Sequence, residues 1–225
     1  MNQGLHKPLT TLLRKEAGLT LVELMVTLFI ASILLSLGGT QFSQFMSNNR
    51  MAAAANQINI ALHTARTEAI KRNGSVTICA TKDWNADKPD CEADATFADG
   101  AIMFIDAEGL DDPNAKVDDG DIVMKAFSPL DSSLSLKVAD TSTTLSSKQF
   151  VSFGPSGFPN STVNGNKMSY NFQLCDDRGD ADTGAGIAAG RWISISPTGR
   201  PQMHRKKTTV EYTGNPNGGC GGGDS

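Results

Sequence analysis

The sequence predicts an α+β fold in which one long N-terminal α-helix packs against an antiparallel β-sheet head. Three observations lead to this prediction. An apolar run extends from Leu19 to Leu37, an amphipathic pattern with a helical period covers residues 46–72, and short β-rich runs then alternate with turn signals. Because the helix and the sheet each carry an apolar face, packing them together buries both faces.

The first segment has the composition of a membrane-spanning helix. Between Leu19 and Leu37 the only charged side chain is Glu23, and the run is close to the ~20 residues that cross a ~30 Å hydrocarbon layer. A basic leader precedes the run, which places the N-terminus in the cytoplasm and the head in the periplasm. We expect residues 19–45 to form the transmembrane half of the helix. The alternatives are a generic membrane anchor and an ordinary secretory signal peptide, but a secretory signal has a shorter apolar region and a small-residue cleavage site at its far end.

Residues 46–72 predict the second half of the same helix, in amphipathic form. Apolar side chains recur there at three- and four-residue spacing, at Met51, Ala55, Ile58, Leu62, Ala65 and Ala69. Asn73-Gly74 then supplies a left-handed stop, because both residue types tolerate a positive φ. We expect one continuous helix from Leu19 to Arg72.

The rest of the chain predicts a single folded head that is mostly β-structure. Runs with strand character cover residues 75–80, 101–105, 121–127, 134–138, 149–153, 169–174, 191–196 and 208–213. Turn signals separate them, including Asp99-Gly100, Asp119-Gly120, Gly154-Pro155-Ser156-Gly157, Asn164-Gly165 and Thr198-Gly199. At 225 residues the chain has room for one membrane helix and one head. We place this head at residues 46–225, with its β-rich part at 75–225.

The four cysteines suit an oxidising compartment such as the periplasm. They are Cys79, Cys91, Cys175 and Cys220, and they allow three disulfide connectivities. Sequence proximity favours Cys79–Cys91, which leaves Cys175–Cys220. A zinc site is the alternative, but the chain has no Cys-x-x-Cys pair and its three histidines are scattered. We therefore expect two disulfides, no metal and no cofactor.

The charge balance is acidic. Removal of residues 1–18 would take away three of the 20 basic side chains and one of the 24 acidic ones, which changes the net charge from −4 to −6. Bulk attraction to nucleic acid is therefore not expected. Thirteen acidic residues lie in residues 83–121, a run that we interpret as a solvated loop surface. The alternative is calcium binding by Asp111, Asp112, Asn114 and residues 118–121, although the EF-hand pattern is missing.

A basic leader ending in Gly18 is followed by Leu19-Thr20-Leu21-Val22-Glu23-Leu24 and by the apolar run. This order resembles the class III signal of type IV prepilins and of their relatives in type II secretion. The resemblance implies that a prepilin peptidase cuts after Gly18, removes residues 1–18 and methylates the new N-terminus at Leu19. The apolar helix stays attached. One difference is Leu19 itself, since the first mature residue in the family is usually phenylalanine.

The resemblance also implies a role for Glu23, which would be the fifth residue of the mature chain. A carboxylate inside an apolar helix requires a partner. When the helices bundle in a filament core, the N-terminal ammonium of Leu19 in the adjacent subunit is such a partner. We therefore assign Glu23 to filament assembly.

The sequence motifs of the head indicate which branch of the type IV pilin superfamily the chain resembles. The helix end at Asn73-Gly74 is followed by Val76-Thr77-Ile78-Cys79, by Cys91, by Gly100–Phe104, by Phe153–Gly157 and by Ile193–Arg200. This order is similar to that of the GspH/FimT/FimU family of minor pilins and pseudopilins, and it implies a pilin-like fold. It also implies a structural subunit rather than an enzyme, which takes part in type IV pilus biogenesis or in type II secretion pseudopilus assembly.

The family resemblance implies a place and a set of partners as well. The protein would be a single-pass protein of the bacterial inner membrane with a periplasmic head, and it would later sit at or near the tip of a pilus or pseudopilus filament. Its partners would be prepilin peptidase and other major and minor pilins or pseudopilins. The choice between a pilus and a secretion pseudopilus stays open.

Basic residues gather in one late segment, residues 199–207, which we expect to be a protruding loop. The FimT branch that this chain resembles implies DNA uptake in natural transformation through a Gly-Arg-x-Arg loop. Gly199 and Arg200 match that motif, but Gln202 replaces its second arginine. The candidate DNA-binding residues are Arg200, His204, Arg205, Lys206 and Lys207. The other interpretation, which we favour, is a basic hairpin that docks on an acidic neighbour in the filament tip.

Overall fold

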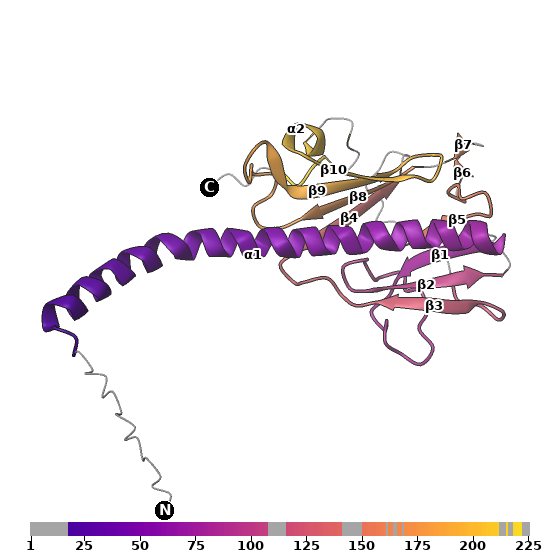
Figure 1. Ribbon diagram of the computed structural model, residues 1–225. Coiled ribbons are helices and arrows are strands. Elements are labelled where there is room, and N and C mark those ends of the chain that lie inside the picture. The colour runs from indigo at the N-terminus through magenta and orange to yellow at the C-terminus, as the bar shows by residue number, and fades with distance from the viewer. Residues whose placement is uncertain are drawn as a thin grey trace, which may run out of the picture. The chain divides into compact units, whose positions relative to one another are not determined.

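A computed structural model describes residues 18–107, 116–140, 150–160, 162–163, 166–167, 169–211, 215 and 218–221. Figure 1 shows the order of its helices and strands. The chain divides into two compact units, with the boundary between Phe45 and Met46. Apart from Gly18, the predicted leader lies outside the described residues, as does the predicted turn at Asn164-Gly165.

The N-terminal helix α1 comprises Leu21–Arg72, so the prediction of one continuous helix is confirmed apart from its first two residues. Its end is also as predicted. Asn73 has a φ of 52°, and the N–H groups of Asn73 and Gly74 donate to the carbonyls of Ile70 (3.3 Å) and Ala69 (3.2 Å). This pair of bonds is a Schellman motif, which satisfies carbonyl groups that the helix end would otherwise leave without partners.

Two four-stranded antiparallel sheets make up most of the second unit. Their strand orders are β3-β2-β1-β5 and β10-β9-β8-β4. The first sheet consists of β1 (Ser75–Ala80), β2 (Ala101–Asp106), β3 (Ile122–Phe127) and β5 (Phe150–Phe153). The second consists of β4 (Ser135–Asp140), β8 (Tyr170–Cys175), β9 (Ile187–Ile195) and β10 (Pro201–Lys206). The short strands β6 (Thr162–Val163) and β7 (Asn166–Lys167) pair with each other.

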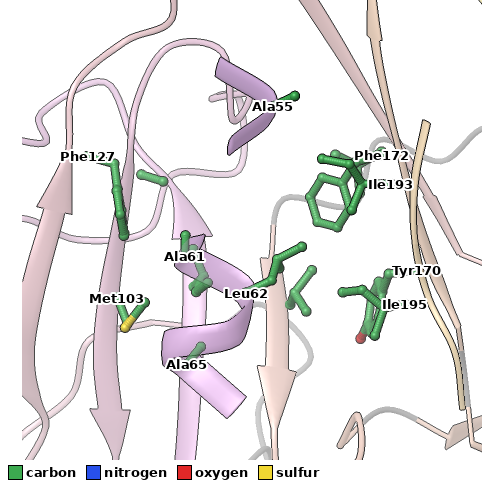
Figure 2. Packing of buried hydrophobic residues seen from close by; sticks show 14 of the residues in the cluster. Ala55, Ala61, Leu62, Ala65, Met103, Phe127, Tyr170, Phe172, Ile193 and Ile195 are labelled. Carbon is green, nitrogen blue, oxygen red and sulfur yellow. The ribbon is translucent and has the colours of Figure 1, made fainter. Parts of the chain in front are cut away.

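The part of α1 that belongs to the second unit lies between the two sheets, with β1, β2 and β3 on one side and β4, β8, β9 and β10 on the other (Figure 1). In Figure 2, Leu62 of α1 lies between Met103 and Phe127 of the first sheet and Phe172 and Ile193 of the second. The small buried residues of this helix are Ala54, Ala55, Ala61, Ala65 and Ala69. These alanines belong to one core cluster together with side chains of both sheets.

The predicted fold class, α+β with a long helix against antiparallel β-structure, is confirmed. The prediction of one sheet is not, because two sheets cover the helix. The strand predicted at 208–213 is also wrong for residues 208–211, the part of it that the structure describes. Residues Lys207–Val210 form the short helix α2, in which the N–H of Glu211 donates to the carbonyl of Lys207 (3.0 Å).

The segment 199–207 is not the protruding loop that the sequence suggested. Residues Pro201–Lys206 form β10, an edge strand of the second sheet, which pairs with β9. The disulfide prediction is confirmed, since Cys79 is bonded to Cys91 and Cys175 to Cys220. The second disulfide joins β8 to the C-terminal segment.

Candidate functional site

Glu23 lies in the first turn of α1. The Oγ1 of Thr20 accepts a hydrogen bond from the N–H of Glu23 (3.2 Å), and the carbonyl of Thr20 accepts one from Leu24 (3.1 Å). Thr20 is therefore the N-cap, and Thr20-Leu21-Val22-Glu23 has the spacing of a capping box. This local role was not predicted, although a threonine three residues before a glutamate is its usual signal.

The surface around Glu23 is apolar and exposed. All residues from Gly18 to Ser36 are exposed, including Leu21 at 74% and Phe29 at 67%. The hydroxyls of Thr27, Ser32 and Ser36 all donate to carbonyls of their own helix, at 2.7–2.9 Å. In contrast, no partner for the Glu23 carboxylate is found among the residues that the structure describes. An exposed apolar surface of this length indicates a partner.

The predicted cleavage pair, Gly18 and Leu19, precedes α1, and the Leu19 residue is 73% exposed. Within the described ranges, no helix combines the length and the apolar character that a bilayer crossing requires.

The predicted basic residues lie along β10. Arg200 precedes the strand, whereas Arg205 and Lys206 lie at its far end, roughly 17 Å away at the usual rise of an extended chain. These three residues are exposed, and no ion pair to them occurs in the described part of the chain. Lys207 differs, since its Nζ lies 3.4 Å from Oε1 of Glu211. Arg205, Lys206 and Lys207 are therefore sequence neighbours at one end of β10, whereas Arg200 lies at the other end.

His204 belongs to the surface of the sheet. Its ring stacks on Trp192 with a centroid distance of 4.4 Å, and its Nε2 lies 3.0 Å from the Oγ of Ser194. Burial lowers the pKa of His204, which favours the uncharged ring. Ser194 and His204 have the spacing of a nucleophile and its base, but the described residues provide no carboxylate bonded to the other ring nitrogen. His204 is therefore not a fifth fixed positive charge.

Arg66 of α1 connects the turn after β5 with the turn before β10. Its Nε donates to the carbonyl of Gly157 (3.0 Å), and its Nη2 donates to that of Thr198 (3.4 Å). Gly157 and Gly199 have φ values of 73° and 75°, and a β-carbon at Gly199 would overlap the carbonyl oxygen of Gly157. This contact was not predicted, because the glycines were interpreted only as signals of two separate turns.

The acidic segment uses part of its charge to hold its own loops. The carboxylates of Asp90 and Asp121 accept four backbone hydrogen bonds between 2.7 and 3.0 Å, and Lys82 pairs with Asp94 at 2.6 Å. Among the residues described, no three His, Cys, Asp or Glu side chains are grouped so that they could hold a metal ion. Asp111, Asp112 and Asn114, named as calcium candidates, lie outside the described residues.

The C-terminal segment covers one end of the second sheet. Cys220 is bonded to Cys175, and its N–H donates to Oδ2 of Asp180 (2.7 Å). Asp180 is only 3% exposed, and its Oδ1 has no partner in the described structure. Burial raises the pKa of this carboxyl group. Asn215, also buried, donates to Oε1 of Gln173 (2.7 Å).

Comparisons with known proteins match both parts of the chain. The family model described as type II transport protein GspH matches residues 54–199. The model described as the prokaryotic N-terminal methylation motif matches residues 13–38. No curated protein matches the chain.

Two crystal forms of the type IV minor pilin FimU from Pseudomonas aeruginosa strain PAO1 are similar to the chain. One is 20% identical, with a TM-score of 0.46, and the match covers 71% of this chain and 92% of that one. The other is also 20% identical, with a TM-score of 0.42, and the match covers 68% of this chain and 91% of that one.

Proposed function

Because the chain belongs to the GspH family of type II transport proteins and carries the prokaryotic N-terminal methylation motif, we propose that it is built into a type IV pilus or a type II secretion pseudopilus. The family is one of minor pilins and pseudopilins, which are structural subunits. The motif implies processing by prepilin peptidase and assembly with other pilins.

The proposed path begins with cleavage after Gly18 and methylation of Leu19. The apolar half of α1 anchors the precursor in the inner membrane with a single pass, and the head lies in the periplasm. The basic leader supports this orientation. The exposed side chains from Leu19 to Ser36 supply an apolar surface for lipid and later for neighbouring helices.

One observation carries the proposal: the Glu23 carboxylate is a lone charge on an exposed apolar helix and has no partner in the described chain. Its capping role uses the backbone N–H of Glu23 and leaves the carboxylate oxygens free to bind. An unpaired charge is costly in an apolar filament core, whereas a paired one is tolerated. The methylated N-terminus of Leu19 in an adjacent subunit provides the positive charge of that pair.

The experiment is Glu23→Ala in the full chain, with Thr27→Ala as the matched control on the same helix. Because the Thr27 hydroxyl is bonded within its own helix, its loss should leave assembly intact. Glu23→Ala should be inserted and cleaved normally but be absent from purified filaments. Normal incorporation of Glu23→Ala would contradict the pairing.

We place the subunit at or near the filament tip, where β10 would dock on an acidic neighbour. The exposed cations at the far end of β10, Arg205 and Lys206, support this docking. The same observation favours a second candidate function, DNA capture, because Lys and Arg bind phosphates by charge and counterion release. Two features count against DNA, namely Gln202 in place of arginine and the lowered pKa of His204.

Titration of duplex DNA into the mature chain at low and moderate salt separates the two candidates. The matched control has Arg200, Arg205, Lys206 and Lys207 replaced by glutamine. Binding that falls with salt and is lost in the control would support DNA capture. No binding at low salt would remove that candidate.

A further inference from the structure

The two turns that Arg66 holds form one rigid surface at the C-terminal end of α1. The turn at Gly157 and the turn at Gly199 touch through their backbones, and the Arg66 guanidinium donates to a carbonyl of each. A β-carbon at Gly157 would lie 2.6 Å from Cδ1 of Ile70, so the helix is in the same contact. These contacts join the two turns within the chain itself, and such preorganisation reduces the entropy lost on binding.

This turn surface exposes apolar side chains beside cations. We define it as Ile70, Pro155, Ser156, Phe158, Thr198 and Arg200, all of which are exposed. Ile70 and Phe158 are 49% and 38% exposed. Apolar and aromatic groups next to arginine are typical of the centres of protein interfaces.

The charge around the turn surface is positive. Arg66, Lys71 and Arg72 lie on the last two turns of α1, and Arg200 follows the second glycine turn. Glu68 is the acidic residue among them, and it pairs with Lys71 at 3.6 Å and with Arg72 at 2.7 Å. An acidic partner therefore complements this surface.

We propose that the turn surface binds an Asp- or Glu-bearing segment of a neighbouring filament subunit. Arg66 is the residue that positions the two turns of this surface for binding. This inference rests on the proposed function, which supplies the neighbouring subunit. A protein partner is favoured over nucleic acid because Ile70 and Phe158 add apolar contact area, which phosphate binding does not use.

The experiment uses the full chain in filaments, with Ser156 replaced by the photo-cross-linking amino acid p-benzoylphenylalanine. The expected result is a cross-link to another filament subunit, mapped by mass spectrometry to a segment that contains Asp or Glu. Arg200→Glu should lower the yield of this cross-link at least about thirtyfold, the size of one interface hot spot. Replacement of the Asp or Glu mapped in the partner subunit by lysine should restore the cross-link yield of the Arg200→Glu variant. Lys137→Glu, an exposed charge reversal on β4, is the matched control.

Arg66→Ala should also lower the yield, because it frees both turns. Its control is Arg50→Ala, which removes another arginine of α1 that pairs with Asp131 at 3.6 Å. Arg66→Lys should restore part of the yield, since lysine keeps a donor but lacks the planar fork.

Several results would overturn the inference: no cross-link to a subunit, a cross-link to a segment without Asp or Glu, a cross-link to nucleic acid, or full yield in Arg200→Glu. The Glu23→Ala variant distinguishes failure of the turn-surface proposal from failure of the proposed filament function. If Glu23→Ala is excluded from filaments while Ser156 gives no subunit cross-link, only the turn surface fails.

Discussion

Gly199 passes so close to Gly157 that a β-carbon on Gly199 would overlap the carbonyl oxygen of Gly157. The two residues lie in different turns, and both turns are bonded to Arg66. Gly199 also has a φ of 75°, a conformation that is costly for other residues. The join between the two turns therefore depends on glycine at this position.

Gly199→Ala should destabilise the second unit by at least about 2 kcal/mol, because the strain of a positive φ adds to the overlap with Gly157. Thermal unfolding should shift down by about 4–8 °C. The matched control is Gly186→Ala, which has a φ of 73° but no atom near its β-carbon. Equal shifts in the two variants would contradict the close contact.

Asp180→Asn should stabilise the head at neutral pH. Burial raises the pKa of the Asp180 carboxyl group above its ordinary value of 3.8, so the folded state holds the proton more tightly than the unfolded state. The stability from this group is present below pH 3.8 and is lost as the pH rises through the raised pKa. The gain from Asp180→Asn should therefore grow from pH 3 to pH 7.

Asp131→Asn is the control for Asp180→Asn, because the pKa of Asp131 is shifted in the opposite direction. Hydrogen bonds from Ser133 lower the pKa of Asp131, so its replacement should cost stability at neutral pH and cost little at pH 3. Thermal unfolding between pH 3 and pH 8 measures both variants. The same pH dependence in both would show that Asp180 does not behave as a buried acid.

Removal of the Cys175–Cys220 disulfide should cost more stability than removal of Cys79–Cys91. The first closes a loop of 45 residues and the second a loop of 12. Loop-closure entropy then gives about 4 and about 3 kcal/mol, respectively. Unfolding of the two double serine variants in urea tests this order. A larger loss for the shorter loop would contradict it.

The His204 ring should titrate below its ordinary pKa of 6.5, because burial against Trp192 disfavours the charged form. A lowered pKa in the folded state means that stability is present above pH 6.5 and is lost as the pH falls through the folded value. NMR titration of the His204 ring protons gives the midpoint. A midpoint above 6.5 would mean that His204 contributes a positive charge to β10.

The sequence predicted the elements whose signals are local. The Asn73-Gly74 stop and the helical period of residues 46–72 led directly to the end of α1. Glycines after Asp99, Asp119 and Thr198 marked turns in which each glycine has a positive φ. Proximity of Cys79 and Cys91 was enough to predict both disulfides.

Features that depend on distant contacts were missed. The strand β10 lacks a regular strand pattern in the sequence, because it contains Pro201, several basic side chains and a register shift between His204 and Lys206. All three features are common at sheet edges. The β-branched residues Thr208, Thr209 and Val210 suggested a strand where α2 forms.

The role of Arg66 could not be predicted either. Its two acceptors, Gly157 and Thr198, are 91 and 132 residues away in the chain. The second sheet escaped prediction for a related reason, since strand patterns do not state which strands pair. In both cases the sequence does not show which distant residues are in contact in the tertiary structure.

In the proposed function, the apolar N-terminal segment is trimmed beside Gly18 and then kept as the assembly element of the mature protein. Mass spectrometry of the N-terminal peptide from membrane-extracted protein measures both steps. We expect a chain that begins with N-methylated Leu19 and retains the segment through Leu37. A chain that still begins at Met1, or a mature chain that has lost residues 19–37, would contradict it.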